Sequence, residues 1–302
     1  MINFLLRPML GILCLLAFLV YTLIIALGVY PIALLKLLSF NRSWRNTSRN
    51  MMEAVSKAWR GCNHFLANYL IRVKIEINGF HQLGPARWYI IIANHISAVD
   101  IMVLTKIFNK APPPRFFMKS TLVWLPVIGT ACWAMDFPLL KRYSKAQLAK
   151  NPKLRGKDLK LLKRNCRKFR RKPLSLMLYP EGTRYTKQKA AEQHTPFKHL
   201  LAPRAGGLAM AIAMMHQKLD SIIDVTIAYP NGCYKFWQFI CGRTKRIVVN
   251  LKRLPVTPDL IGNYQHDEKF REHMQNYVNQ LWKEKDKLLT QLLDQPPECT
   301  QT

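Results

Sequence analysis

The chain has 302 residues, 49% of them hydrophobic, and its 46 Lys and Arg outnumber its 17 Asp and Glu, which gives a formal charge of +29. The apolar content excludes a disordered chain, and the length suits one large domain with an appendage. The charge predicts an anionic partner, such as nucleic acid, anionic lipid or a phosphorylated substrate.

The seven cysteines form no C-x-x-C pair, and no histidine cluster has the spacing of a zinc site. We therefore expect no disulfide framework and no bound metal. A soluble part without disulfides fits a reducing compartment.

The amino-terminal segment has no charged residue between Pro8 and Leu35. This run exceeds both the ~20 apolar residues that cross a bilayer and the ~7–15 of a cleaved signal peptide. Residues 1–40 are therefore predicted to be a membrane anchor, either a single span or a hairpin that bends at Pro31. Lys and Arg are more numerous after the run than before it, so the positive-inside rule predicts that the rest of the chain is cytoplasmic.

Residues 41–73 are predicted to form an amphipathic helix in the membrane interface. Basic residues lie opposite an apolar face made by Met52, Val55, Trp59, Phe65, Leu66, Tyr69 and Leu70. An ordinary helix that faces a protein core explains the same pattern equally well.

Strands and helices then alternate along the chain. Apolar runs and period-two patterns predict strands at 72–79, 87–94, 115–119, 173–180, 221–230 and 245–254. Helical periodicity follows the second strand at 97–108 and ends the chain at 267–294. The alternation predicts that residues 74–302 form one α/β domain, a mainly parallel twisted sheet flanked by helices, with ligands at the carboxyl ends of the strands.

Residues 141–172 hold fifteen Lys or Arg and a single acid, Asp158. Next to a membrane anchor, attraction to anionic lipid explains this charge better than a merely solvated face. Nucleic acid is the least favoured partner, because no aromatic-rich nucleic-acid motif accompanies the charge.

His95 and Asp100 directly follow the second predicted strand. Within a helix, positions i and i+5 lie about 140° apart, so these side chains meet only if His95 lies in a turn and the helix starts near Ser97. Asn94 and Ser97 are candidate caps for that start, and Ser97 is favoured as a cap over a nucleophile. Asp100 could then orient His95 as a general base; a structural histidine at a helix start is the alternative.

The stretch YPEGTRYTK, residues 179–187, follows another predicted buried strand. Pro180 and Gly182 favour a turn whose backbone N–H groups suit an anion. Arg184, with Lys187 nearby, supplies a planar fork suited to phosphate. A surface β-turn with an incidental arginine is the alternative interpretation.

Taken together, NHxSxxD at His95 and EGTR 86 residues later resemble the motifs of the glycerophospholipid acyltransferase family, the lysophosphatidic acid acyltransferases. The resemblance covers residues 70–255 and includes KSTLVWLPVIG (119–129), LLKR (139–142) and DVTIAYP (224–230). It implies that His95 and Asp100 are catalytic. It also implies that substrate is bound by Lys119, Arg142, Glu181, Gly182, Thr183 and Arg184.

Three positions depart from many bacterial members of that family: Thr121 stands in place of a glutamate, Asp136 of a glycine and Asp224 of a proline. The stretches KSTL, LKR and DVTIAY look closer to the branch that contains the lysocardiolipin acyltransferases. The whole chain resembles bacterial inner-membrane proteins usually labelled probable acyltransferase. The resemblance thus implies an enzyme of the bacterial inner membrane with its catalytic domain on the cytoplasmic side.

The reaction implied by the resemblance is direct acyl transfer from acyl-CoA or an acidic acyl carrier protein to the free hydroxyl of lysophosphatidic acid. It needs no cofactor and no nucleophilic Ser or Cys, since His95 takes the hydroxyl proton as phosphatidic acid forms. Lysocardiolipin or another lysophospholipid is the alternative acceptor, which would make the protein a remodelling enzyme. The non-enzyme alternative is a basic, membrane-tethered protein that binds lipid or RNA.

Overall fold

The computed structural model describes residues 2–38, 41–79, 83–109, 111–112, 114–116, 118–119, 124, 129, 131, 137, 139–140, 173–232 and 234–294. The basic segment 141–172, Arg142 included, lies outside these residues. The chain divides into two compact units. One is made of Met1–Cys14, Leu66–Pro114 and Leu174–Thr302, and the other of Leu15–Phe65 and Arg115–Pro173.

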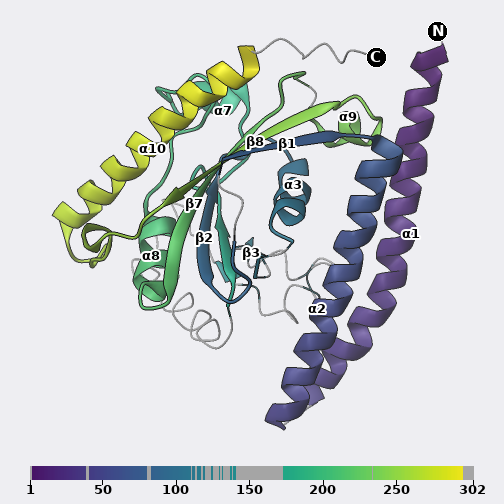
Figure 1. The fold of residues 1–302 in the computed structure, drawn as a ribbon, viewed down its shortest axis with the longest axis horizontal. Coiled ribbons are helices and arrows are strands. Elements are labelled where there is room, and N and C mark those ends of the chain that lie inside the picture. The colour runs from purple at the N-terminus through teal and green to yellow at the C-terminus, as the bar shows by residue number, and fades with distance from the viewer. Residues whose placement is uncertain are drawn as a thin grey trace, which may run out of the picture. The chain divides into compact units, whose positions relative to one another are not determined.

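The main sheet has six strands in the order β1-β8-β7-β2-β6-β3 (Figure 1). Their bounds are β1 Lys74–Gly79, β2 Trp88–Ala93, β3 Pro114–Phe116, β6 Ser175–Leu178, β7 Leu219–Ala228 and β8 Arg246–Leu254. β2 runs parallel to both β6 and β7, and β1 runs parallel to β8, whereas β7 and β8 are antiparallel. The predicted α/β fold with a mainly parallel sheet is therefore confirmed.

The strand expected at 115–119 is divided between two sheets. β3 ends at Phe116, and β4 (Met118–Lys119) pairs in parallel with β5 (Leu139–Leu140) in a separate two-stranded sheet. So short a run gives no signal of this division, because both halves have the same local pattern.

β2 is buried because it lies between β6 and β7 in the sheet. Ile90, Ile91 and Ile92 are all 0% exposed, although their side chains alternate between the two faces. A continuous apolar run of β-branched residues is what a parallel strand covered on both faces requires. The carboxyl end of β2, at Ala93, is thus fixed in the middle of the sheet.

Helices cover both sides of the sheet. α3 (Val99–Ile107) lies on one side, and α8 (Gly206–Met215) and α10 (Glu268–Asp294) lie on the other (Figure 1). α10 follows the predicted periodicity, whereas α8 was not predicted, because GGLAMAIAMM is apolar all round and has no polar face to mark a helical period. Two short helices, α7 (Lys187–Glu192) and α9 (Phe236–Ile240), were not predicted either.

α10 brings a buried charge onto the sheet. The Lys285 side chain is 0% exposed, and its ammonium lies 2.7 Å from Asp224 Oδ1 on β7. The same ammonium donates to the Val225 carbonyl at 2.6 Å and to the Thr226 hydroxyl at 3.2 Å. A buried ammonium is tolerated only with such partners, so this cluster sets one register of α10 on β7. Asp224, one of the departures from the family pattern, is thus the partner of Lys285.

Two long helices precede the sheet. α1 spans Ile2–Leu38, and α2 spans Arg42–Phe65 and continues as a π-helical turn over Leu66–Ile71. A helix is therefore present where one was expected within residues 41–73. The stretch Leu6–Leu38 of α1 is long and apolar enough, by length and composition, to cross a membrane.

Within the second unit, α1 and α2 run antiparallel. Tyr21 donates from its hydroxyl to Asn63 Oδ1 at 2.8 Å, and farther along α1, Val29 packs with Met52. Contacts that move forward along one helix while they move backward along the other define a helical hairpin.

Candidate active site

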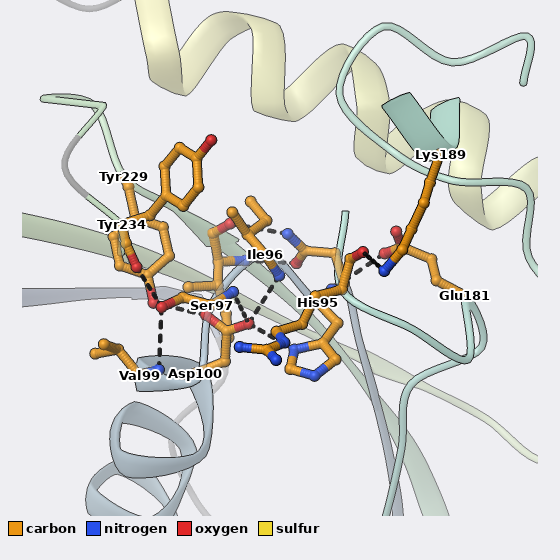
Figure 2. A network of polar contacts seen from close by, with 12 residues as sticks. His95, Ile96, Ser97, Val99, Asp100, Glu181, Lys189, Tyr229 and Tyr234 are labelled. Atoms are coloured by element: carbon orange, nitrogen blue, oxygen red, sulfur yellow. Dashed lines mark hydrogen bonds and ion pairs between the residues drawn. The ribbon is translucent and has the colours of Figure 1, made fainter. Parts of the chain in front are cut away.

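His95 and Asp100 meet in the turn between β2 and α3. His95 Nδ1 lies 2.9 Å from Asp100 Oδ2, and α3 begins only at Val99 (Figure 2). His95 is therefore outside the helix, which is the condition the sequence imposed for contact at this spacing. The two predicted catalytic side chains are paired.

Asp100 accepts hydrogen bonds from four donors. Oδ2 accepts from His95 Nδ1 and, at 2.8 Å each, from the backbone N–H groups of Ile96 and Ser97. Oδ1 accepts from the Tyr229 hydroxyl at 2.6 Å. All four partners are donors, and the two carboxylate oxygens are their acceptors. The proton of the neutral imidazole then resides on Nδ1, which leaves Nε2 with a free lone pair.

Tyr229 is a site residue that the sequence reasoning missed. It directly follows β7, whose carboxyl end lies beside that of β2 because the two strands are parallel. Burial, followed by the charge of Asp100, raises the pKa of Tyr229 well above its ordinary value of 10.0. The hydroxyl therefore stays protonated and remains a donor. The signal was present: a tyrosine at the carboxyl end of a predicted strand.

The imidazole of His95 stacks on a second tyrosine, Tyr179. The ring centroids are 4.1 Å apart and the planes are inclined by 17°. Burial, with a further contribution from Asp100, holds the pKa of Tyr179 well above its ordinary value, so the stacking partner is neutral. The His95 side chain keeps 16% of its surface exposed, which leaves the ring accessible while one of its faces is covered.

The Ser97 hydroxyl is bound on both sides within the turn before α3. It accepts from the Val99 N–H at 3.1 Å and donates to the backbone carbonyl of Tyr234 (Figure 2). Both hydroxyl functions are thus used in structure, but Ser97 is not the N-cap of α3: that position is Ala98, which makes no side-chain cap hydrogen bond.

Asn94, the other candidate cap, is used differently. Its amide donates to the Ile227 carbonyl at 2.9 Å and accepts from the Ile227 N–H at 2.8 Å, and the residue is fully buried. The expectation that it caps α3 was wrong, because β7 lies next to it and presents a matching donor and acceptor. Asn94 instead ties the end of β2 to β7.

The EGTR turn lies against the same histidine. The Tyr185 N–H donates to the His95 carbonyl at 2.7 Å, and the turn is closed by a bond from the Gly182 N–H to the Tyr179 carbonyl at 2.8 Å. Gly182 has φ +72°, a conformation that a residue with a side chain adopts only with strain. The two predicted motifs therefore form one site.

Glu181 points into the protein. Its Oε1 accepts from the His95 N–H at 3.1 Å and its Oε2 from the Leu201 N–H at 3.0 Å. Burial raises the pKa of Glu181 to about 7, although the two backbone donors lower it. Glu181 thus connects three segments of backbone. Its predicted role in binding substrate remains a prediction.

Thr183 and Arg184 lie at the outer part of the turn, where Arg184 is exposed. Lys189, on α7, donates from its ammonium to Thr183 Oγ1 at 2.7 Å and to the Arg184 carbonyl at 3.1 Å. Lys187, the cation singled out in the sequence, is exposed instead. The spacing of the motif alone does not distinguish these two lysines.

The other predicted binding residues belong to the second unit. The backbone of Lys119 lies in β4, its side chain is outside what the structure describes, and so is Arg142. Among the described residues, no group of three or more His, Cys, Asp or Glu is placed to hold a metal ion.

The fold and the site together define a class of protein. A carboxylate orients an accessible imidazole at the carboxyl edge of an α/β sheet, and a glycine-containing turn with an exposed arginine lies beside it. An imidazole held in this way suits a general base, and an exposed arginine suits an anionic ligand.

Comparison with known proteins identifies the family. The family model described as Acyltransferase matches residues 74–230, more than half of the chain. The chain belongs to this acyltransferase family. The matched segment contains both motifs of the site and ends just after Tyr229.

Curated relatives agree with this assignment. The chain is 27% identical over 230 residues to mouse 1-acyl-sn-glycerol-3-phosphate acyltransferase epsilon, an alignment that covers 68% of this chain and 58% of the mouse protein. It is 26% identical over 280 residues to probable 1-acyl-sn-glycerol-3-phosphate acyltransferase 5 of Arabidopsis thaliana, with 87% and 69% covered. The chain thus spans roughly three-fifths to two-thirds of the length of these relatives.

Among solved structures, the chain is similar to the 1-acyl-sn-glycerophosphate acyltransferase PlsC of Thermotoga maritima. The identity is 16% and the TM-score 0.44, with 88% of this chain and 97% of the other covered. The family assignment rests on the family model rather than on this alignment.

Proposed function

We propose that this protein transfers a fatty acyl group from a thioester, acyl-CoA or acyl carrier protein, to the free hydroxyl of lysophosphatidic acid, and so makes phosphatidic acid. The observation that carries the proposal is the direct connection of the two motifs. The His95–Asp100 pair and the EGTR turn share two hydrogen bonds through the backbone of His95. The names of the mouse and Arabidopsis relatives support the choice of acceptor.

The chemistry requires one base. His95 Nε2 takes the proton of the acceptor hydroxyl while the oxygen attacks the thioester carbonyl. The tetrahedral intermediate then collapses, expels the thiolate and returns the proton from the imidazolium to it, which yields ester and free thiol. A positioned base of this kind contributes about 10²- to 10⁴-fold to the rate. Both substrates bind at once, so no covalent enzyme intermediate forms.

The phosphate of the acceptor is assigned to the EGTR turn. The guanidinium of Arg184 matches phosphate geometry, and the backbone N–H of Thr183 is assigned to the same phosphate. The Gly182 N–H donates to the Tyr179 carbonyl, so Gly182 would act by shaping the turn. Lys119 and Arg142 belong to this proposal through the family resemblance alone. Glu181 would act by holding the turn against His95.

The setting proposed for the reaction is the cytoplasmic side of a bacterial inner membrane. Acceptor and product are lipids, and α1 has the length and composition of a membrane helix. The excess of Lys and Arg after α1 favours the cytoplasmic side. In this proposal α2 lies in the interface, and residues 141–172 attract anionic lipid or an acidic carrier protein.

The test is an assay of purified full-length protein with oleoyl-CoA and a panel of lysophospholipids, for the wild type and His95→Ala. We expect phosphatidic acid and free thiol from lysophosphatidic acid, and a loss of about 10²- to 10⁴-fold in kcat for the variant. Because the His95 side chain is partly exposed, the thermal unfolding midpoint of His95→Ala should stay close to that of the wild type.

Other outcomes change the proposal in defined ways. Transfer confined to lysocardiolipin or another lysolipid would keep the mechanism and make the protein a remodelling enzyme. Transfer to no acceptor, or transfer that persists in His95→Ala, would refute the proposed reaction.

A further inference from the structure

Lys189 closes the EGTR turn from a helix that follows it. Its backbone N–H donates to Thr186 Oγ1 at 3.2 Å, which caps α7, and its side chain reaches back to Thr183 and Arg184 (Figure 2). One residue therefore fixes both ends of the segment 183–189.

The charge of Lys189 has no counter-charge among the residues that the structure describes. Both of its acceptors, a hydroxyl and a carbonyl, are neutral. The acid nearest in sequence, Glu192, accepts instead from Gln188 at 2.9 Å. Glu181 directs both its oxygens to backbone N–H groups. A half-buried ammonium in such surroundings favours an anionic ligand.

The ammonium also keeps a donor to offer. A lysine ammonium has three N–H groups, and the contacts to Thr183 and Arg184 use two of them. The third N–H group of Lys189 remains for a ligand at this turn, which also carries the exposed guanidinium of Arg184. A phosphate bound there would meet a planar fork from Arg184 and a point charge from Lys189, which are complementary ways of binding one phosphate.

We propose that Lys189 is a specificity residue of this site: it holds the 183–184 turn and supplies the second positive charge that binds the phosphate monoester of the acceptor. The inference rests on the proposed function and deepens it. It assigns the second cation to Lys189 rather than to Lys187, which lies closer to Arg184 in sequence.

Lys187 provides a matched control within the same helix. It is exposed, and the described residues make no polar contact with its side chain. Lys187→Met and Lys189→Met remove the same charge from the same six-residue helix. A general effect of net charge on binding to lipid would therefore appear equally in both variants.

The first experiment measures steady-state transfer to lysophosphatidic acid in detergent micelles for the wild type, Lys189→Met, Lys189→Arg and Lys187→Met. We expect Lys189→Met to raise KM for lysophosphatidic acid about 10- to 100-fold, with kcat within about threefold, since a charge-assisted hydrogen bond is lost. Lys189→Arg should recover most of this loss, and Lys187→Met should stay within about twofold of wild type. Monoacylglycerol, which lacks the phosphate, should be used equally by all four proteins.

Equal KM values in Lys189→Met and Lys187→Met would overturn the inference. So would a fall in kcat alone that Lys189→Arg does not repair, because that is the result of a merely structural lysine. If Lys189→Met also lowers the unfolding midpoint, the ratio of lysophosphatidic acid to monoacylglycerol use still decides, since a folding defect lowers both rates together.

A binding measurement separates this inference from the proposed function. Calorimetric titration with sn-glycerol 3-phosphate reads the phosphate site without turnover. Suppose the wild type is inactive, but its affinity for glycerol 3-phosphate falls about tenfold or more in Lys189→Met. This result would refute the proposed acceptor and support the anion site. If the wild type is active and Lys189→Met leaves the affinity for glycerol 3-phosphate unchanged, the proposed reaction stands and the role of Lys189 is refuted.

Discussion

The turn after β2 and the turn after β6 each carry a carboxylate, and the two carboxylates are held in different ways. Asp100 accepts from two backbone amides, an imidazole and a tyrosine hydroxyl. Among the residues that the structure describes, Glu181 accepts from two backbone amides only, and burial raises its pKa to about 7. The difference teaches that two buried carboxylates of one site can be held by different numbers and kinds of donors.

The outward parts of the two turns differ as well. In the first turn the polar groups of Ser97 and Asn94 are bonded to neighbouring backbone, whereas the imidazole of His95 stays partly exposed. The second leaves the charges of Arg184 and Lys189 without a carboxylate among the described residues. The first turn is therefore held by its own hydrogen bonds, whereas the second presents positive charge that an anionic ligand would complement.

Lys285→Met should have the largest effect, because it removes the support that both turns share. Lys285 fixes α10 on β7, the strand that ends at Tyr229, and the next residue, Asp286, accepts from the His199 N–H in the loop that leads to Leu201. Breaking a buried ion pair from one side leaves an unpaired charge, so we expect a loss of about 3–5 kcal/mol in the free energy of unfolding.

Urea unfolding in detergent measures that loss, and the double variant Lys285→Met with Asp224→Leu is its control. The double variant should recover most of the stability, since no buried charge remains. A single variant as stable as the wild type would show that α10 is held by its apolar stripe alone.

The pH dependence of Glu181 sharpens the contrast between the carboxylates. Its folded pKa of about 7 lies above the ordinary 4.5, so the folded protein binds this proton more tightly than the unfolded chain. The resulting stability is fully present below pH 4.5 and is lost as pH rises through 7, by roughly 3 kcal/mol in total. We expect the wild type to lose stability relative to Glu181→Gln as pH rises from 4.5 through 7.

Thermal unfolding of both proteins between pH 5 and 8 measures this shift. Glu181→Gln loses one backbone hydrogen bond at every pH, which lowers its stability by a constant amount. The diagnostic quantity is therefore the change in the stability difference with pH, not its size at one pH. Parallel stability curves for the two proteins would mean that Glu181 keeps an ordinary pKa.

Tyr229→Phe is expected to have the smallest effect. It removes one of the four donors to Asp100 while it keeps the ring in place. We expect kcat to fall about 10-fold with KM changed less than about twofold, because the loss concerns a hydrogen bond to a charged group that orients the base. Steady-state kinetics provide the measurement.

Tyr234→Phe is the matched control for this variant. The Tyr234 ring lies edge-on to Tyr229 at 6.4 Å, but it is the backbone carbonyl of Tyr234 that contacts Ser97. Its kcat should stay close to wild type. A Tyr229→Phe enzyme as active as this control would show that three donors suffice for Asp100.

The sequence by itself predicted the strands of the main sheet, their mainly parallel arrangement and the condition under which His95 meets Asp100. These follow from local patterns: the apolar run of β2, and a spacing that permits contact only across a turn. Arg184 was placed at the second turn by the same kind of reasoning, since Gly182 and Pro180 mark it locally.

The tertiary structure alone decided which groups complete the site. Tyr229 reaches Asp100 from 129 residues away, Asn94 pairs with β7 instead of capping α3, and Glu181 turns inward to His95 and Leu201. α8 escaped prediction because its sequence is apolar all round and therefore has no polar period. These outcomes depend on which strands become neighbours, and neighbours across the sheet are fixed by packing of the whole core rather than by any short segment.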